Sequence, residues 1–125
     1  MMIYFFDTYA LVEVVKGTSN YEKYKTSTII TTLLNLMELH YSCLQDLGGE
    51  RAKTIFDSLK EFAVDFEEQD VINANIFRYS QNKKGKKISY VDSIGYVLSI
   101  KYGVKFLTGD REFKDVENVE FISSV

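Results

Sequence analysis

Two kinds of hydrophobic pattern alternate along this chain. Residues 2–6 (MIYFF) form an unbroken apolar run, which is typical of a strand buried on both faces of a parallel sheet. From Thr32 onward, apolar residues instead recur at helical spacing until Gly48 and Gly49 end the segment. The positions that give this helix an apolar face are Leu33, Leu34, Met37, Tyr41 and Leu44.

The rest of the chain continues this alternation. Residues 8–17 have the spacing of a helix that Gly17 ends, and residues 18–25 are polar enough for a short helix or a loop. A helix from residue 67 to the lysine-rich loop at 82–87 has Val71, Ala74, Ile76 and Phe77 as its expected buried face. The other predicted strands cover 27–31, 64–66, 104–107 and 119–123, and the other predicted helices cover 50–62 and 89–102. This order predicts a three-layer α/β/α sandwich around a mainly parallel sheet of about five strands.

Length and composition fit one globular domain over residues 1–125. Of the 125 residues, 46% are apolar and 26% are charged, which is ordinary for a folded protein. The formal net charge is -3, so a nucleic-acid partner would have to meet a local basic patch. The single cysteine, Cys43, allows no disulfide within the chain, and the N-terminal residues lack the basic leader of a signal peptide. Because no apolar run reaches the roughly 18–20 residues of a membrane span, we expect a cytoplasmic protein without a membrane partner.

Four acidic residues are predicted to meet at one edge of the sheet. Asp7 follows the first strand, Asp110 follows the strand at 104–107, and Asp92 lies in the first turn of its helix. Glu38 is about one and a half turns into the helix that follows the second strand. Binding sites of parallel sheets form beyond the carboxyl ends of the strands, where these residues would lie. Each acid also has a local alternative, since the aspartates could cap helices and the glutamate could face solvent.

The convergence of four carboxylates favours a metal site. Crowded carboxylates repel one another and are costly to bury without compensation. Oxygen ligands select hard ions such as Mg²⁺ or Mn²⁺, and the absence of clustered His or Cys argues against zinc. Such ions suit phosphate chemistry, because they polarise a phosphoryl oxygen and activate a bound water. The hydroxyls of Thr8 and Thr108 could hold a water or a phosphate oxygen, although ordinary turn bonding explains each equally well.

Four stretches of the sequence resemble a known family. FFDTYALVE, LNLMELHY, SYVDSIGYVLSIKYG and FLTGDREF are similar, in order and spacing, to the four acidic motifs of PIN-domain ribonucleases, particularly the VapC-type toxins of prokaryotic toxin–antitoxin pairs. The resemblance implies Mg²⁺- or Mn²⁺-dependent endonucleolytic cleavage of RNA by an activated water, a homodimer, and an antitoxin protein that blocks the toxin. It also implies that Thr108 contributes through its hydroxyl and that the catalytic metal ligands are Asp7, Glu38, Asp92 and Asp110.

Basic residues next to the acidic motifs are candidates for contact with RNA. The loop lysines immediately precede the helix of Asp92, where they could contact phosphates or simply be solvated. Arg111 could contact a phosphate or form a salt bridge with Asp115. The lysines in question are Lys83, Lys84, Lys86 and Lys87.

Two further features predict contact surfaces. Gly95 and Ser99 form a small-residue face that would let another helix approach closely, for instance the helix of a dimer partner. Tyr9 and Tyr90, each beside one of the acids, could stack on unpaired bases. Tyr9 also departs from the family, in which many relatives carry a small polar residue after the Asp-Thr pair.

Three other interpretations remain open from the sequence. The chain could be a housekeeping PIN nuclease without a toxin role, or a non-catalytic PIN-fold module that binds RNA or protein. A response-regulator receiver also gathers acids at strand ends, but here no acid follows the third predicted strand in the phosphoacceptor position.

Overall fold

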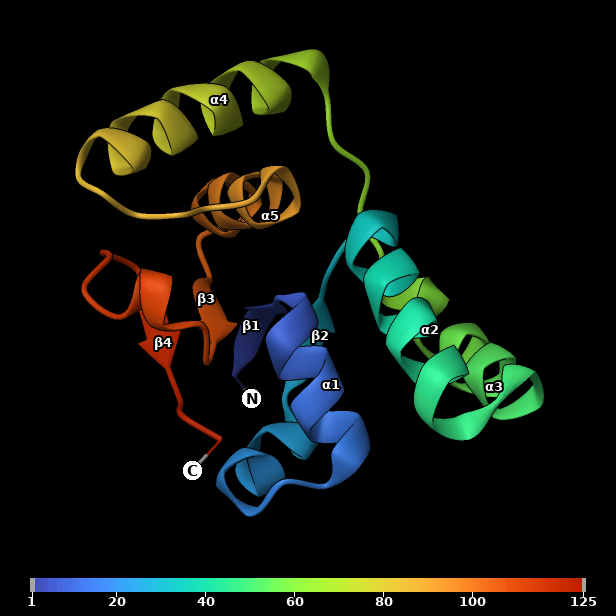
Figure 1. The fold of residues 1–125 in the computed structure, drawn as a ribbon. Helices are drawn as coiled ribbons and strands as arrows, with labels where there is room; N and C mark the ends of the chain where they lie inside the picture. The colour runs from blue at the N-terminus through green and yellow to red at the C-terminus, as the bar shows by residue number, and fades with distance from the viewer. Residues whose placement is uncertain (1, 125) are drawn as a thin grey trace.

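A computed structural model describes residues 2–124 as a parallel sheet with helices on both faces (Figure 1). The strands lie in the order β2-β1-β3-β4 and comprise β1 (Ile3–Phe6), β2 (Thr28–Ile30), β3 (Lys105–Thr108) and β4 (Val119–Phe121). The helices are α1 (Thr8–Lys16), α2 (Leu33–Leu47), α3 (Gly49–Leu59), α4 (Glu68–Lys83) and α5 (Tyr90–Lys101). Short 3₁₀ segments are η1 (Ser19–Thr26), η2 (Lys60–Phe62) and η3 (Arg111–Phe113). The predicted α/β/α sandwich with a parallel sheet is therefore confirmed, with four strands.

The predicted strand at 64–66 does not form. Only Ala63, just before it, makes an isolated parallel bridge to Thr31, and the backbone N–H of Val64 donates to the carbonyl of Thr31 at 2.8 Å. Asp65 and Phe66 are exposed, so this short stretch buries too little surface to extend the sheet. It forms instead the extended connection from η2 to α4 (Figure 1).

The strands divide their side chains between two cores. Tyr4, Phe6 and Leu107 pack on one face of the sheet with buried residues of α1 and α2. Phe5 and Phe106 point to the other face, where their stacked rings lie 5.7 Å apart beneath α5. Both faces are thus buried, as the unbroken apolar run of β1 predicts.

The small face of α5 packs on the sheet and not on a partner. A Cβ atom at Gly95 would lie 2.6 Å from Cε1 of Phe5 and 3.2 Å from Cε1 of Phe106. Ser99 is fully buried, and its hydroxyl donates to the carbonyl of Tyr96 at 2.6 Å. The hypothesis that this face contacts a dimer partner is wrong, because the sheet already covers it.

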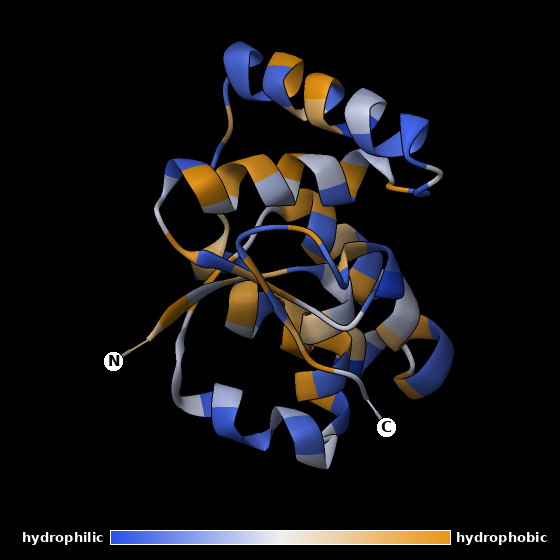
Figure 2. Ribbon diagram, turned by 90° about the vertical axis from the view of Figure 1, so that its left-hand side faces the viewer, coloured by the Kyte–Doolittle hydropathy of each residue, from blue (hydrophilic) through white to orange (hydrophobic). Residues whose placement is uncertain are grey.

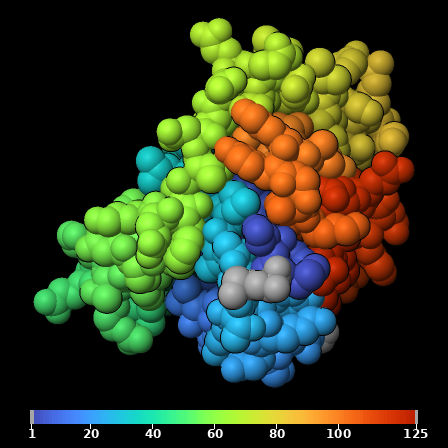
Figure 3. Space-filling model, turned by 180° about the vertical axis from the view of Figure 1, so that it is seen from behind, coloured from blue at the N-terminus to red at the C-terminus, as the bar shows by residue number. Residues whose placement is uncertain are grey.

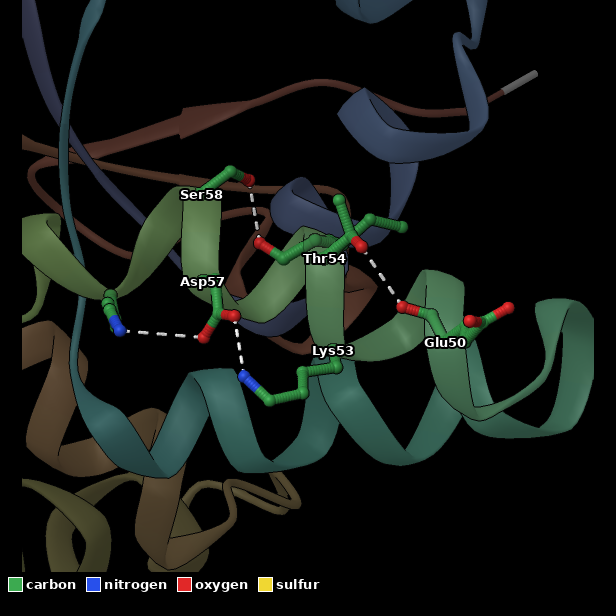
Figure 4. Close-up of polar contacts among 7 residues, drawn as sticks. Glu50, Lys53, Thr54, Asp57 and Ser58 are labelled. Atoms are coloured by element: carbon green, nitrogen blue, oxygen red, sulfur yellow. Dashed lines mark hydrogen bonds and ion pairs between the residues drawn. The ribbon is translucent and has the colours of Figure 1, made fainter.

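The α2–α3 hairpin projects away from the sheet (Figure 1) and exposes the predicted apolar face of α2. The buried residues of α2 are Asn35, Leu36, Leu39 and Cys43, on the side that packs towards α1. The exposed large side chains are Leu33, Met37, Tyr41 and Leu44. The outer face of α3 is polar by contrast: Asp57 forms an ion pair with Lys53, which Figure 4 shows. Its carboxylate lies 2.6 Å from the ammonium of Lys53 and 3.5 Å from that of Lys60 in η2.

The prediction for α4 is right in part. Ala74 is buried and Phe77 is half-buried, with its ring stacked on that of Tyr96 at 4.1 Å. Val71 and Ile76 are exposed, because α4 is an outer layer that contacts the rest of the molecule through α5 (Figure 2). None of the described helices is long and apolar enough to cross a membrane.

Candidate active site

Asp7 lies where β1 ends and α1 begins, and its side chain is 1% exposed. Its Oδ1 accepts a hydrogen bond from the backbone N–H of Ala10 at 2.8 Å, so it caps α1. Its Oδ2 accepts a hydrogen bond from the hydroxyl of Thr108, at the end of β3. One carboxylate oxygen of Asp7 therefore caps α1, as the local alternative predicts, and the other contacts the neighbouring strand.

Asp110 follows β3 by two residues and is held by the same threonine. Its backbone N–H donates to Oγ1 of Thr108 at 3.0 Å, while its Oδ1 accepts from the backbone N–H of Glu112 at 3.0 Å. Asp110 thus caps η3, as the local alternative predicts. Thr108 connects Asp7 to the Asp110 turn through one hydroxyl.

Asp92 and Glu38 reach the same edge of the sheet from α5 and α2. Asp92 lies in the first turn of α5, and its backbone N–H donates to Oγ of the N-cap Ser89 at 3.0 Å. Glu38 is exposed, and its Oε1 accepts a hydrogen bond from the hydroxyl of Thr8, the first residue of α1. Thr8 therefore positions Glu38.

Asn35 belongs to the same hydrogen-bond network as Thr8 and Glu38, although its sequence position did not mark it as a site residue. The side-chain amide of Asn35 donates to Oγ1 of Thr8 at 3.1 Å, and its Oδ1 accepts from the hydroxyl of Thr32 at 2.6 Å. Asn35 is fully buried, one turn before Glu38 on α2. The sequence does carry a sign of this role, because Asn35 is an amide among the otherwise apolar residues on the buried side of α2. A buried amide needs hydrogen-bond partners for both its oxygen and its nitrogen.

The electrostatics show that the acids influence one another. Burial, together with the charges of Asp92 and Asp110, raises the pKa of Asp7 well above its usual value, although hydrogen bonds from Thr108 and the Ala10 amide oppose the shift. Burial raises the pKa of Asp92 to about 6, and the charges of Asp110 and Glu38 contribute to the shift, against a lowering by Ser89. Four carboxylates from four separate sequence motifs therefore share one electrostatic environment.

Cations of the described residues do not neutralise this cluster. The four ion pairs found within residues 2–124 lie elsewhere, on η1, on α3 and η2, and between Asp70 and Lys101. Over the same residues, no three Asp, Glu, His or Cys side chains are arranged to hold a metal ion among them. The chemistry of the donors fits a hard divalent cation, because they are anionic oxygens without a matching positive charge.

The residues predicted to contact RNA are basic and mostly exposed. Arg111 forms no ion pair with Asp115 among the described residues, so the salt-bridge alternative is wrong. Lys83, Lys84 and Lys87 are exposed, and Lys86 is half-buried. The ammonium of Lys83 lies 4.6 Å from the ring centroid of Tyr79.

Two tyrosines singled out from the sequence differ in their surroundings. Tyr9 is half-buried, its hydroxyl donates to Oγ of Ser124 at 2.8 Å, and its ring lies against Gly109. Tyr9 therefore packs against the loop between β3 and Asp110, where its ring already has neighbours. Tyr90 is exposed at the start of α5.

The fold and the site define an α/β protein with an acidic cluster at the carboxyl edge of a parallel sheet. The chain belongs to the PIN-domain family, whose sequence model matches residues 4–119. Proteins of this family are generally nucleases that use divalent metal ions. This assignment confirms the family resemblance and excludes the receiver alternative.

Solved structures share the fold over nearly the whole chain. VapBC2 from Rickettsia felis, bound to a DNA fragment from its promoter, matches with a TM-score of 0.74 and 22% identity over 98% of this chain and 100% of that chain. DNA-bound VapBC from Salmonella typhimurium matches with a TM-score of 0.73 and 19% identity over 100% of both chains. A toxin–antitoxin complex from Klebsiella pneumoniae matches with a TM-score of 0.71 and 16% identity over 93% of this chain and 94% of that chain. No curated protein matches the chain in sequence.

Proposed function

We propose that this chain is a metal-dependent endoribonuclease and the toxin of a type II toxin–antitoxin pair. The observation that carries the proposal is the buried carboxylate of Asp7, which shares its surroundings with Asp92 and Asp110 without a cationic partner in residues 2–124. A buried carboxylate of this kind is costly to ionise, which raises its pKa, unless a cation joins it. The family assignment supports nuclease chemistry at this site.

The proposed ligands of Mg²⁺ or Mn²⁺ are Asp7, Glu38, Asp92 and Asp110. No three of these side chains form a chelating group as they lie. The four acids would hold the ion either directly or through its bound waters, because Mg²⁺ usually keeps several waters. When bound, the ion would supply an activated water and stabilise charge on the phosphate.

The chain contributes orientation through hydroxyls and an amide. Thr108 donates to Asp7 and accepts the N–H of Asp110, so it fixes these two proposed ligands relative to one another. Thr8 orients Glu38, and Asn35 holds Thr8. Removing a group that holds a ligand in this way commonly lowers metal affinity or activity by about 10- to 100-fold.

Replacing Asp92 with Asn tests the proposed reaction. The variant should cut cellular RNA at least about 100-fold more slowly than the wild type in Mn²⁺, because it loses an anionic ligand while keeping its shape. Cut sites are mapped by sequencing new 5′ ends, with EDTA as the zero-activity reference. Asp65→Asn, the same change at an exposed residue outside the four acidic motifs, should cut at the wild-type rate. Full activity in the Asp92 variant would refute the proposal.

A non-catalytic binding module is the second candidate, favoured by the lack of a preformed three-ligand group among residues 2–124. Melting curves with Mn²⁺ separate the two. An ion at 100 times its dissociation constant adds about 2.7 kcal/mol to the free energy of unfolding, so a metal enzyme should melt at a higher temperature in Mn²⁺. An unchanged melting temperature, together with intact RNA, would favour the module.

The toxin role is proposed over a housekeeping nuclease on the strength of the solved relatives, some of which are toxin–antitoxin complexes. Induced expression in a bacterial host should arrest growth, and the protein encoded beside it should relieve the arrest. Normal growth during expression of a protein active in vitro would favour the housekeeping role.

This chain has an apolar pocket between α1, α2 and α3, which we propose as a contact site for an antitoxin. The pocket has a volume of about 500 Å³, and most of its lining is aliphatic, including Leu11, Val15, Leu47 and Ile55. Lys16, Asp46 and Arg51 add charged groups to the lining. We propose that an apolar side chain of the antitoxin fills it.

A homodimer is proposed to bury the exposed apolar row of α2. Met37 is 60% exposed and Tyr41 is 64% exposed, and Leu33 extends the row by one turn. Leu33 and Met37 also line a hollow of about 590 Å³ that reaches Phe56 of α3. Exposed apolar residues that lie next to one another, instead of being scattered singly, are typical of a contact surface.

A further inference from the structure

An exposed aromatic ring at the start of α5 is covered on one face by a guanidinium group. Tyr90 is the first residue of α5, two positions before Asp92, and is 66% exposed. The guanidinium carbon of Arg78 lies 4.1 Å from the centroid of the Tyr90 ring. Arg78 is itself fixed, because its Nε donates to the carbonyl of Ile88 at 2.7 Å. The ring is therefore held in place without being buried.

The fold does not depend on this ring for its anchoring. Ile88, which is 2% exposed, provides the apolar contact that attaches the loop to the core, and Arg78 ties the backbone of the same residue to α4. Ser89 caps α5 through its own hydroxyl. An aromatic residue that stays largely in water and caps nothing contributes little to stability, so its large flat surface is available for a ligand.

A basic pocket adjoins the ring. It has a volume of about 370 Å³ and is lined by Arg78, Asn82, Lys86, Lys87, Ile88 and Ser89, with no carboxylate among them. Lys83 and Lys84, predicted as equivalent RNA contacts, do not line it. A pocket with three cationic side chains suits a phosphate group.

Hydrogen bonds connect this pocket to two acids of the cluster. Ser89, at one side of the pocket, accepts the backbone N–H of Asp92. The backbone N–H of Lys87 donates to Oε1 of Glu112 at 3.1 Å, and the backbone N–H of Glu112 donates to Oδ1 of Asp110 at 3.0 Å. These bonds fix the loop that lines the pocket relative to the first turn of α5 and to the turn that carries Asp110.

We propose that Tyr90, supported by Arg78, is a stacking platform for one unpaired base of a single-stranded RNA, and that Lys86 and Lys87 hold the adjoining phosphate. This inference rests on the proposed nuclease function, and it assigns to named residues of this chain the holding of one nucleotide of the substrate. Only an unpaired base can offer a free face to the ring, because a duplex covers both faces of each base. A guanidinium behind the ring adds a cation–π contribution to the platform.

Tyr90→Leu and Tyr90→Phe test the platform by binding, with EDTA present so that RNA stays intact. Fluorescence anisotropy should show that Tyr90→Leu weakens binding of a single-stranded RNA oligonucleotide roughly 5- to 150-fold, the measured range for one base stacked on an aromatic side chain. Tyr90→Phe should bind like the wild type, because it keeps the ring. Binding of a blunt RNA duplex should be the same for all three proteins.

Tyr79→Leu is the matched control. Tyr79 is 65% exposed, but the cation over its ring is Lys83, which does not line the basic pocket, whereas the cation over Tyr90 is Arg78, which does. This variant should bind the single strand within about twofold of the wild type, and melting curves should confirm that both leucine variants are folded. A series of oligonucleotides, each with one abasic position, should identify a single position that weakens the wild type and leaves Tyr90→Leu unaffected.

The results separate this inference from the proposed function. If the wild type cuts RNA and Tyr90→Leu binds the single strand as tightly as the wild type, the platform is refuted and the nuclease stands. If Tyr90→Leu loses affinity while the wild type never cuts RNA, the platform stands and the nuclease is refuted. Equal losses for Tyr79→Leu and Tyr90→Leu would also refute the platform, because any exposed tyrosine would then serve.

Discussion

At the residue scale, single hydroxyl and amide groups organise the acidic cluster. Asp7 and Asp110 could be placed from sequence, because each follows a buried strand and parallel strands bring such residues together. The bonds of Thr108 and Asn35 could not be placed, since they join segments far apart in the chain. Thr108 is an example. The sequence suggested that its hydroxyl could hold a water or a phosphate oxygen, but it did not predict that this hydroxyl contacts both Asp7 and the backbone of Asp110.

Thr108→Val should lower the rate of RNA cleavage by roughly 10- to 100-fold, the usual effect of losing a group that orients a metal ligand. Valine keeps the shape of threonine but cannot donate to Asp7 or accept the N–H of Asp110. Single-turnover cleavage at saturating Mn²⁺ measures the effect. Thr108→Ser keeps the hydroxyl and should stay within a few-fold of the wild type. Equal rates for the valine and serine variants would show that the hydroxyl has no role in orienting the site.

The raised pKa of Asp92, about 6, makes the stability of the metal-free protein depend on pH. The unfolded value is near 4, so between about pH 4 and 6 the folded state binds more protons, and stability falls as the pH rises. By pH 7 the loss from this group should approach 2–3 kcal/mol, on the order of two pKa units. In Asp92→Asn this contribution should be absent.

Urea unfolding in EDTA at pH 4, 5, 6 and 7 measures this dependence. The difference between the wild type and Asp92→Asn reports the carboxylate of Asp92 together with its coupling to the neighbouring acids, while groups away from the cluster are common to both proteins. That difference should favour the variant increasingly as the pH rises. A constant difference across the four pH values would mean that Asp92 titrates normally. Asp65→Asn should follow the wild type throughout, because Asp65 is exposed.

At the element scale, periodicity found the helices but did not decide which face is buried. In α2, Leu36, Leu39 and Cys43 form one apolar face, while Met37 and Tyr41 belong to another. With two apolar faces on one helix, spacing alone cannot distinguish the core face from a face that meets a partner. The strand expected at 64–66 failed for a different reason, since Asp65 and Phe66 stay exposed and the stretch buries too little surface to extend the sheet.

Gly95→Ala should destabilise the protein because α5 packs directly on the sheet at that position. The added Cβ would lie 2.6 Å from Cε1 and 3.0 Å from Cζ of Phe5, a ring fixed within the core. Overpacking of this kind costs about 1–3 kcal/mol, against a gain of about 1 kcal/mol from helix propensity. Urea unfolding should therefore show a net loss. Gly49→Ala is the control, since its nearest neighbour would be Cδ2 of Leu44 at 3.9 Å and it should be neutral or stabilising. A Gly95 variant as stable as the wild type would mean that the ring shifts at no cost.

At the scale of the whole molecule, the proposed functions belong to three different surfaces. The acidic cluster lies at the carboxyl edge of the sheet, with the platform of Tyr90 beside it on α5. The apolar pocket lies between α1, α2 and α3, and the exposed row of α2 runs along the projecting hairpin. Figure 3 shows from behind that α3 lies at the lower left of the molecule and α4 across its top. Substitutions on one surface should therefore leave the others intact.

Met37→Glu should convert a dimer into a monomer if the row of α2 is the contact between two copies. A charge at the centre of a buried apolar contact is costly to desolvate, and the paired symmetry of a dimer introduces that charge twice. Light scattering after size-exclusion chromatography should give twice 14.4 kDa for the wild type and 14.4 kDa for the variant. Ile100→Glu, at another exposed apolar residue on α5, should remain dimeric. A dimeric Met37 variant would move the contact to another face, and a monomeric wild type would leave the row of α2 to the antitoxin.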